Sequence, residues 1–213
     1  MSQKTLVIGN KNYSSWSLRP WLFLSKNNIE FTEKMIWLDE PTFKPAIEGF
    51  GSGGKVPVLV EGELIIWDSL AIIETAIDRY DCQYAWPKDA DLRAHARSIS
   101  NEMHAGFGTL RNDCTMDIRS KHNIDISEAL QQDVSRICTL WETALAQSGN
   151  QGRWLYGDFS AADAMYAPVV FRFNTYGMKV SSTVQAYMDY VMADAVLARW
   201  VAEAKLETRE LYV

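Results

Sequence analysis

The stretch KVPVLVEGELIIWDSLAII, residues 55–73, decides the fold class because two strands and a helix follow one another in it without a break. Two short runs of aliphatic and β-branched residues flank Glu61-Gly62, a pair that favours a tight hairpin turn. Asp68 then precedes an apolar pattern with helical spacing, and it is a good candidate for the residue that caps the helix. The stretch therefore predicts an α/β unit that ends in a hairpin and a helix.

The residues before this hairpin predict the rest of the α/β unit. Residues 4–9 have the pattern of a short buried strand, residues 14–27 carry apolar residues at helical spacing, and residues 31–37 alternate partly like a strand. Residues 40–54 are rich in glycine and proline, so we expect a loop there with at most a short irregular helix.

The character of the sequence changes near residue 81. Residues 81–88 are polar and contain a proline, which is typical of a linker. Beyond them almost nothing has the pattern of a strand. The expected helices cover residues 89–113, residues 127–147, a segment that begins at Ser160, where Asp163 completes the spacing of a capping box, and one or two helices within residues 181–205. We therefore predict two domains, an α/β domain over residues 1–80 and an all-helical domain over residues 89–213.

The composition argues against several classes of protein. Of the 213 residues, 47 % are hydrophobic, which allows a sizeable core and argues against disorder. The formal charge of −6 argues against nucleic acid and against an anionic membrane as partners, because both require a basic face. The N-terminus lacks the features of a signal peptide, and no apolar run is long enough to span a membrane.

The cysteines point to a reducing environment. Cys82, Cys114 and Cys138 are odd in number and widely spaced, with no pair at the spacing of a metal site and no accompanying histidine cluster. We expect neither a metal nor a disulfide framework. Reduced thiols in a cytoplasmic protein are the simplest interpretation.

Hydroxyl groups are concentrated in NYSSWSLRPW, residues 12–21, directly after the first predicted strand. Ser14, Ser15 and Ser17 are either ordinary capping residues or donors to a bound sulfur or phosphate. On spacing alone, capping is the simpler interpretation, with Arg19 as a solvated charge.

Two further segments have both a structural and a functional interpretation. Pro57 either marks an edge strand, where a missing N–H is tolerated, or follows a cis bond that turns the backbone of Val56 toward a peptide-like ligand. At the next helix, Asp68 or Ser69 caps the N-terminus, and both can also bind a ligand. Ser69 would then bond a carboxylate while Asp68 receives an ammonium, which suits the head of an α-amino acid.

Four short motifs occur in an order that resembles the cytosolic glutathione transferases. They are SSWSLR after the first strand, KVPVL, DSLAI, and SAADA in the helical half. The resemblance covers nearly the whole chain, and the opening SSxSxxR is most similar to the zeta class, which includes maleylacetoacetate isomerases. Trp16 stands where members of that class usually have cysteine. The resemblance implies a thioredoxin-like N-terminal domain that binds glutathione, a helical domain that supplies most of the second-substrate pocket, and a homodimer.

The resemblance also implies roles for individual residues. Ser14 would be the hydroxyl that activates the thiol of glutathione, with Ser15 close by. The expected glutathione-binding residues are Trp16 beside these serines, Val56 with paired backbone bonds ahead of a cis Pro57, Asp68 and Ser69 at the γ-glutamyl head, and, from their charge, Lys55 or Lys44 facing the glycyl carboxylate.

This assignment is chemically reasonable. A free thiol has a pKa of about 8.5, so only a few per cent is thiolate at neutral pH. A hydroxyl donor and a helix N-terminus both favour the thiolate. We therefore expect a glutathione transferase that presents the thiolate to a small electrophile, with glutathione as co-substrate and no metal. Isomerase or peroxidase activity, or a non-catalytic binding protein on the same fold, are the alternatives. The absence of an N-terminal CxxC argues against a thioredoxin-like redox protein.

The second-substrate site has weaker signals. His104 and Arg111 are seven residues apart on one predicted helix, so we expect them to share a face. They would suit an anionic electrophile if they line the cleft; otherwise they are a buried histidine and a surface arginine. Arg172 lies among apolar residues and is the other candidate, because an arginine in such surroundings usually has a partner.

Overall fold

The computed structural model describes residues 3–38, 41, 43–149 and 153–210. Its first half contains a four-stranded sheet with the strand order β2-β1-β3-β4. The strands are β1 (Lys4–Gly9), β2 (Thr32–Ile36), β3 (Val58–Glu61) and β4 (Leu64–Trp67). β1 and β2 are parallel, whereas β3 is antiparallel to both β1 and β4. Residues 40 and 42 of the predicted loop lie outside the described residues.

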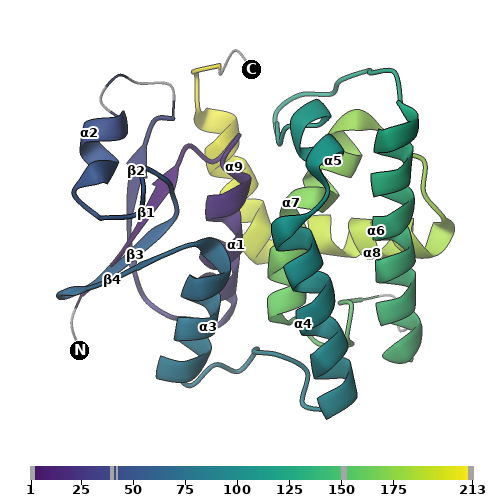
Figure 1. Cartoon of the computed structure of the whole chain (residues 1–213), viewed down its shortest axis with the longest axis horizontal. Coiled ribbons are helices and arrows are strands. Elements are labelled where there is room, and N and C mark those ends of the chain that lie inside the picture. Colours follow the sequence, from purple (N-terminus) through teal and green to yellow (C-terminus); the bar gives the residue numbers. More distant parts are fainter. Residues whose placement is uncertain (1–2, 39–40, 42, 150–152, 211–213) are drawn as a thin grey trace.

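The helices of the first half cover the sheet. They are α1 (Ser15–Lys26), the six-residue α2 (Phe43–Glu48) and α3 (Ser69–Arg79). In Figure 1, α1 and α3 lie between the sheet and the second half of the chain, and α2 lies on the far side of the sheet. The mixed sheet with these helices is the thioredoxin-like arrangement that we predicted, and the α/β-then-helical fold class is confirmed.

Every named element after α3 in the described part of the chain is a helix. These helices are α4 (Ala90–Ala105), α5 (Gly108–Asp113), α6 (Glu128–Gln147), α7 (Ala161–Tyr176), α8 (Ser182–Met192) and α9 (Ala195–Leu206). No helix within the described residues is long and apolar enough to cross a membrane. The linker predicted at residues 81–88 and the domain bounds around it stay predictions.

The single helix that we predicted over residues 89–113 is two helices. α4 ends at Ala105, Gly106 is extended, and Phe107 adopts a left-handed conformation with φ 59° before α5 begins. A Cβ atom at Gly106 would lie 2.8 Å from the carbonyl oxygen of Glu102. The close approach of residue 106 to the last turn of α4 therefore requires glycine. The break lets the side chain of Phe107 enter the core, where it is 7 % exposed.

One hydrophobic core extends through both halves of the chain. It includes Leu6 and Leu22 from the first half together with Trp141 and Tyr166 from the second. α7 packs against α1 and α4 and is buried on nearly every side, as expected for a helix that is apolar all round. The packing of α1 against α7 therefore fixes the start of α1 relative to the helical half.

Candidate active site

A cleft of about 730 Å³ lies where three turns of the α/β half meet the end of α4. The lining residues come from the β1–α1 turn, the segment between β2 and β3 with the start of α2, the β4–α3 turn and the last turn of α4. They are Tyr13, Ser14, Ser15, Trp16, Leu38, Phe43, Ser52, Gly53, Gly54, Lys55, Val56, Pro57, Trp67, Asp68, Ser69 and His104. Of the twelve candidates from the sequence, the cleft brings together nine; Lys44, Arg111 and Arg172 lie outside its lining.

The β1–α1 turn places Ser14 at the N-cap position of α1, but its hydroxyl does not cap the helix. It donates to Ser17 Oγ at 2.7 Å, and Ser17 Oγ also accepts from the backbone N–H of Gly9 at 3.1 Å. A Cβ atom on residue 9 would come within 2.9 Å of Ser14 Oγ, so the glycine allows this close approach. The interpretation of the Ser14 side chain as a helix cap is therefore wrong.

Ser15, the first residue of α1, is linked to the helical half. Its Oγ accepts a hydrogen bond from Arg172 Nη2 at 3.1 Å, and both side chains are buried. Arg172 also donates to the carbonyl oxygens of Leu110, Arg111 and Cys114. The arginine thus reaches the cleft only through the hydroxyl of Ser15.

The loop before β3 presents backbone to the cleft. The Val56–Pro57 peptide bond is cis, and Gly53 and Gly54 have φ values of 66° and 74° that glycine adopts most readily. Lys55 is exposed on the cleft wall. Lys44 is also exposed, on α2, and it lines a smaller neighbouring cavity that shares Phe43, Gly53 and Gly54 with the cleft.

The β4–α3 turn holds a capping residue and an unused hydroxyl next to each other. Asp68, with φ 76°, accepts hydrogen bonds from Leu70 N at 2.9 Å and Ala71 N at 3.3 Å, so its predicted capping role is confirmed. Ser69 is only 1 % exposed, and its Oγ has no hydrogen-bond partner among the described residues. A buried hydroxyl at the start of an eleven-residue helix, facing a cleft, is arranged to receive a polar ligand group.

His104 brings the helical half into contact with this turn. Its Nε2 lies 3.1 Å from Asp68 Oδ2, while its buried Nδ1 lacks a hydrogen-bond partner within the described part of the chain. The expectation that His104 and Arg111 share a helix face is wrong, because the break at Gly106 separates them. Arg111 turns back and donates to the carbonyl oxygens at the end of α4, with Nε 2.9 Å from Gly106 O.

Trp16, which lines the cleft, packs against a cluster of arginines in which Arg19 is buried and Arg111 is half-buried. The guanidinium carbon of Arg19 lies 4.1 Å from the Trp16 ring centroid and that of Arg111 lies 4.6 Å from it. Arg19 is 1 % exposed and donates to Met165 O at 3.1 Å, so our expectation of a solvated charge is wrong. Burial, followed by the charges of Arg111 and Arg172, lowers the pKa of Arg19.

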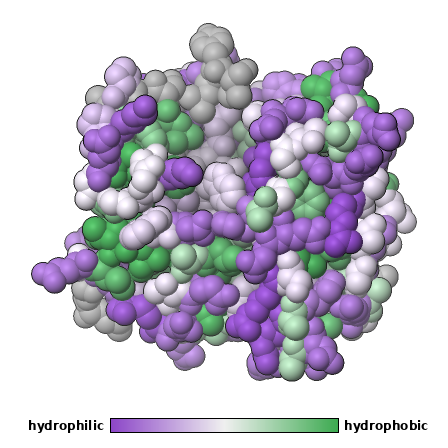
Figure 2. Space-filling model, in the orientation of Figure 1, coloured by the Kyte–Doolittle hydropathy of each residue, from purple (hydrophilic) through white to green (hydrophobic). Residues whose placement is uncertain are grey.

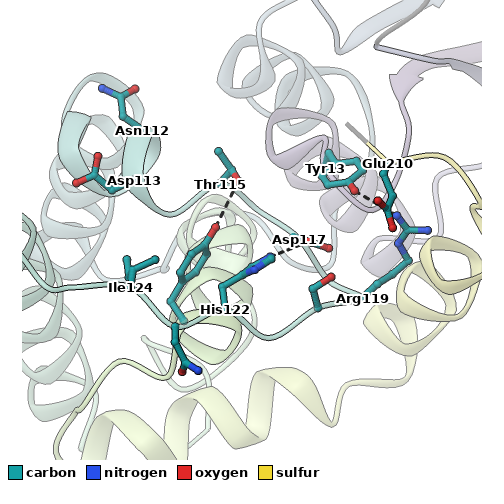
Figure 3. Close-up of a pocket in the computed structure, with 12 residues that line it drawn as sticks. Tyr13, Asn112, Asp113, Thr115, Asp117, Arg119, His122, Ile124 and Glu210 are labelled. Atoms are coloured by element: carbon teal, nitrogen blue, oxygen red, sulfur yellow. Dashed lines mark hydrogen bonds and ion pairs between the residues drawn. The ribbon is translucent and has the colours of Figure 1, made fainter. Parts of the chain in front are cut away.

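A second cavity, of about 710 Å³, adjoins the first at Tyr13, which lines both. Its other lining residues are the last two residues of α5, several residues of the segment that follows α5, Tyr176 and Glu210. Figure 3 shows its polar groups facing one another: His122 Nε2 lies 2.9 Å from Asp117 Oδ2, and Arg119 Nη2 donates to Tyr13 Oη at 3.2 Å. Sequence reasoning missed this cavity because residues 115–124 form no regular element whose pattern could place them.

Sequence reasoning also missed some lining residues of the first cleft. Tyr13 is adjacent to the serine cluster in the sequence, and this proximity was the signal available for it. Trp67 precedes the capping aspartate and reads as a strand residue, although it is 51 % exposed. Within the described residues, no group of three or more His, Cys, Asp or Glu side chains is placed to hold a metal ion.

Comparison with known proteins identifies the family. The family model for the glutathione S-transferase N-terminal domain matches residues 13–79 of the sequence. The family model for the glutathione S-transferase C-terminal domain matches residues 124–203. A "Probable maleylacetoacetate isomerase" of Caenorhabditis elegans is 28 % identical over 183 residues, which cover 85 % of each chain. A dichloromethane dehalogenase of Methylophilus leisingeri is 36 % identical over 95 residues, 42 % of this chain and 33 % of that protein.

Solved structures share the fold. A maleylacetoacetate isomerase from Methylobacterium extorquens AM1, with bound malonate and glutathione, superposes with a TM-score of 0.71 at 21 % identity over 97 % of this chain and all of the other. A glutathione S-transferase from the Antarctic clam Laternula elliptica has a TM-score of 0.74 at 18 % identity, covering 97 % of this chain and 95 % of that one. At these identities the likeness shows the fold alone.

The two family models describe successive domains of one family and match both halves of the chain. The resemblance to the glutathione transferases that the four sequence motifs indicated is thereby confirmed. The chain belongs to the glutathione S-transferase family of enzymes, and within that family it is similar to the zeta class that includes maleylacetoacetate isomerases.

Proposed function

We propose that the chain binds glutathione in the first cleft and holds its sulfur as a thiolate for attack on a small electrophile. The observation that carries this proposal is the buried, unpartnered hydroxyl of Ser69 at the start of α3, in a cleft that also contains Ser14, Ser15 and the cis Val56–Pro57 bond. An unpartnered buried hydroxyl is costly unless a ligand completes its hydrogen bonds.

Each part of glutathione has a matching group in the cleft. The carboxylate of the γ-glutamyl head suits Ser69 Oγ and the N-terminus of α3, and its ammonium suits the carboxylate of Asp68. The backbone of Val56 offers paired hydrogen bonds to the cysteinyl residue. Lys55, with Lys44 beyond it, supplies positive charge for the glycyl carboxylate, and Trp16 forms the wall next to the sulfur.

The serines of the β1–α1 turn would solvate the sulfur anion. Lowering the pKa of the thiol by about two units requires about 2.7 kcal/mol. A charge-assisted hydrogen bond from Ser14 or Ser15, together with the N-terminus of α1, is of that magnitude. The thiol proton goes to solvent on binding, and the thiolate is then available as a nucleophile beside the electrophile.

We assign the second cavity to the electrophile. It shares Tyr13 with the glutathione cleft, and its lining is mostly polar, with Asp117, Arg119 and His122 among its charged and titratable groups. A small polar electrophile therefore suits it better than a large apolar one. Of the three predicted substrate contacts, His104 lines the glutathione cleft instead of this cavity, so it could meet the electrophile only at the sulfur end of that cleft. Arg111 and Arg172 lie outside both linings and would act on the substrate only through their charge.

Glutathione-dependent cis-trans isomerisation is the second candidate function. It is favoured by the 28 % identical relative named as a probable maleylacetoacetate isomerase and by the polar second cavity. In this reaction the thiolate would add to an alkene carbon, the resulting single bond would rotate, and loss of the thiolate would regenerate both the alkene and glutathione. A non-catalytic ligand carrier is the third candidate, and it does not explain why the cleft holds serines at the sulfur position.

We also propose a homodimer in the cytoplasm, with glutathione as the co-substrate. Figure 2 shows a hydrophobic surface over β4, where Leu64 is 39 % and Trp67 is 51 % exposed, and a second copy is the partner that the resemblance implies. The cytoplasmic part of the proposal is supported by the three cysteines, all of which are free. Light scattering of the purified protein measures the oligomeric state, and a monomer at micromolar concentration would contradict the dimer.

The proposed function is tested by titrating the purified protein with glutathione. Trp16 and Trp67 line the cleft, so their fluorescence should report binding, and the ultraviolet absorbance of the thiolate should appear well below the pKa of the free thiol. Ser69→Ala should weaken binding by about tenfold, since it removes one hydrogen bond to a charged group.

The matched control is Ser100→Ala. Ser100 is also buried with an unpartnered hydroxyl, but it lies in α4 outside the cleft lining, so its removal should leave the affinity unchanged. No binding by the wild-type protein would reject the proposed function. Binding without a shift in the thiol pKa would favour the ligand carrier.

A further inference from the structure

Arg172 is a buried cation without an ionic partner. It is 6 % exposed, lies in the middle of α7, and forms no ion pair with any carboxylate in the described part of the chain. Its hydrogen bonds go to the carbonyl oxygens at the end of α5 and, at 3.1 Å, to Ser15 Oγ. A buried charge is expensive unless a counter-charge is near, so this arrangement favours an anion just beyond Ser15.

The two serines of the turn differ in how their protons are used. The hydroxyl proton of Ser14 is engaged by Ser17 Oγ at 2.7 Å. Ser15 Oγ accepts from Arg172 and donates to no described residue, so its own proton is free to point into the cleft that Ser15 lines. A hydroxyl that accepts from a guanidinium is also polarised, which makes it a stronger donor.

We propose that Arg172 is a positioning residue that holds the hydroxyl of Ser15 toward the cleft, so that Ser15 rather than Ser14 donates the hydrogen bond to the sulfur of glutathione. This inference rests on the proposed function and deepens it by choosing the donor. No bond is made or broken by the arginine. The thiol proton leaves to solvent, the serine keeps its proton, and the hydrogen-bonded series runs from guanidinium to hydroxyl to thiolate.

The surroundings of Arg172 support this role. Arg111 approaches from α5, Cys114 lies at the end of α5, and Tyr176 lies on α7 itself; these titratable or charged groups act on the arginine. Burial, and then the charge of Arg111, lower the pKa of Arg172 to about 10, so the guanidinium is still charged at neutral pH. Arg19 and Arg111, which both contact the Trp16 ring, add further positive charge next to the turn. A thiolate on the cleft side would lower the electrostatic cost of all three.

The experiment measures the pKa of bound glutathione from its thiolate absorbance in the wild-type protein, Ser14→Ala, Ser15→Ala, Arg172→Gln and the double variant Ser15→Ala/Arg172→Gln. We expect Ser15→Ala to raise the thiol pKa by about one to two units, the size of a lost charge-assisted hydrogen bond, and Ser14→Ala to raise it less. If the arginine acts through Ser15, the double variant should show little more than the larger of the two single shifts.

Three outcomes separate the possible failures. No thiolate in the wild-type protein would reject the proposed function, and with it this inference. A low thiol pKa in the wild-type protein that survives Ser15→Ala but is lost in Ser14→Ala would overturn this inference and leave the proposed function standing. Fully additive shifts in the double variant would overturn the positioning role of Arg172.

Arg172 also satisfies carbonyl oxygens at the end of α5, so Arg172→Gln can fail to fold. Arg172→Lys, which keeps the charge and one donor group, is the second variant, and it should retain part of the low thiol pKa. If neither arginine variant folds, the comparison of Ser15→Ala with Ser14→Ala still decides the identity of the donor. A larger shift in Ser14→Ala would then reject the inference.

Discussion

The Trp16 ring, which lines the cleft, is in contact with two guanidinium groups and with the imidazole of His104. Arg19 and Arg111 lie 4.1 and 4.6 Å from its centroid, and the ring of His104 is 5.3 Å away. The negative electrostatic potential of the indole face attracts both guanidinium groups. The residue that departs from the usual zeta pattern therefore has a structural role in holding the arginine cluster.

We predict that Trp16→Ala lowers the free energy of unfolding by about 2–3 kcal/mol, because both cation–π contacts and the packing over the arginines are lost. Trp16→Phe should recover more than half of this loss, since it keeps an aromatic face for the guanidinium groups. Urea denaturation of the three proteins provides the measurement. Equal stabilities of the alanine and phenylalanine variants would show that the ring faces do not matter.

At the scale of the element, α7 begins with a buried carboxylate. Asp163 accepts from Ser160 N and Leu155 N at 2.9 Å, from Ser160 Oγ at 3.0 Å and from Tyr187 Oη at 3.3 Å. This is the capping box that the spacing of Ser160 and Asp163 predicts, extended by contacts to the preceding turn and to α8. Burial raises the pKa of Asp163 to about 6, although its hydrogen bonds act in the opposite direction.

This raised pKa gives the stability a definite dependence on pH. The folded protein binds the Asp163 proton more tightly than the unfolded chain, so the favourable contribution is complete at low pH and is lost as the pH rises through about 6. Between pH 5 and pH 7.5 the wild-type protein should lose about 1.4 kcal/mol from this group, and Asp163→Asn should not.

The measurement is the urea midpoint of both proteins at the two pH values. We expect Asp163→Asn to be less stable at both, since the amide cannot accept all four hydrogen bonds, and the gap between the two proteins to be smaller at pH 7.5. A gap that widens with pH would show that the native carboxyl has a lowered pKa instead.

At the scale of the whole molecule, the β1–α1 turn ties the two halves together. Lys11, only 4 % exposed, pairs with Glu33 of β2 at 2.6 Å and with Glu203 of α9. Asn12 is fully buried and donates to Asp117 Oδ1 at 2.8 Å, while its Oδ1 accepts from Arg119 N at 3.0 Å. The turn that carries the candidate catalytic serines thus also forms buried polar contacts between the two halves.

We therefore predict that the chain unfolds in one transition, with far-ultraviolet circular dichroism and tryptophan fluorescence changing together. Asn12→Ala should lower the free energy of unfolding by about 2–3 kcal/mol, because it leaves two buried groups without partners. Asn101→Ala, on the exposed face of α4, is the control and should be nearly neutral. Separate transitions for the two halves would contradict this prediction.

The parts of the molecule that could be predicted from sequence are those with local signals. The hairpin around Glu61-Gly62 and the cap at Asp68 depend on neighbouring residues, and both are present. The break at Gly106 could not be predicted, because glycine inside an apolar helical pattern is also compatible with a continuous helix. The sequence could not show that Arg19 is buried, because its hydrogen-bond partner, Met165 O, is 146 residues away in the chain.

In the candidate site, too, the features with local sequence signals could be predicted and those that depend on distant contacts could not. Apart from His104, the predicted residues that line the first cleft were found because each belongs to a short contiguous motif that resembles the family. The surroundings of Arg172 were not, because the hydroxyl that it contacts is 157 residues away. The irregular segment from residue 115 to residue 124 lines a whole cavity without any periodic pattern. Tertiary contacts of this kind carry no local sequence signal.

The bond between Arg172 and Ser15 has a consequence for how such proteins can be recombined. The first half holds the groups proposed to recognise glutathione, whereas the second half contributes Arg172, which donates to the Ser15 hydroxyl that is proposed to contact the sulfur. Recognition and reactivity would then be inherited from different parts of the gene. A chimaera that joined residues 1–80 to a helical half without this arginine would keep its affinity for glutathione and lose much of the acidity of the bound thiol.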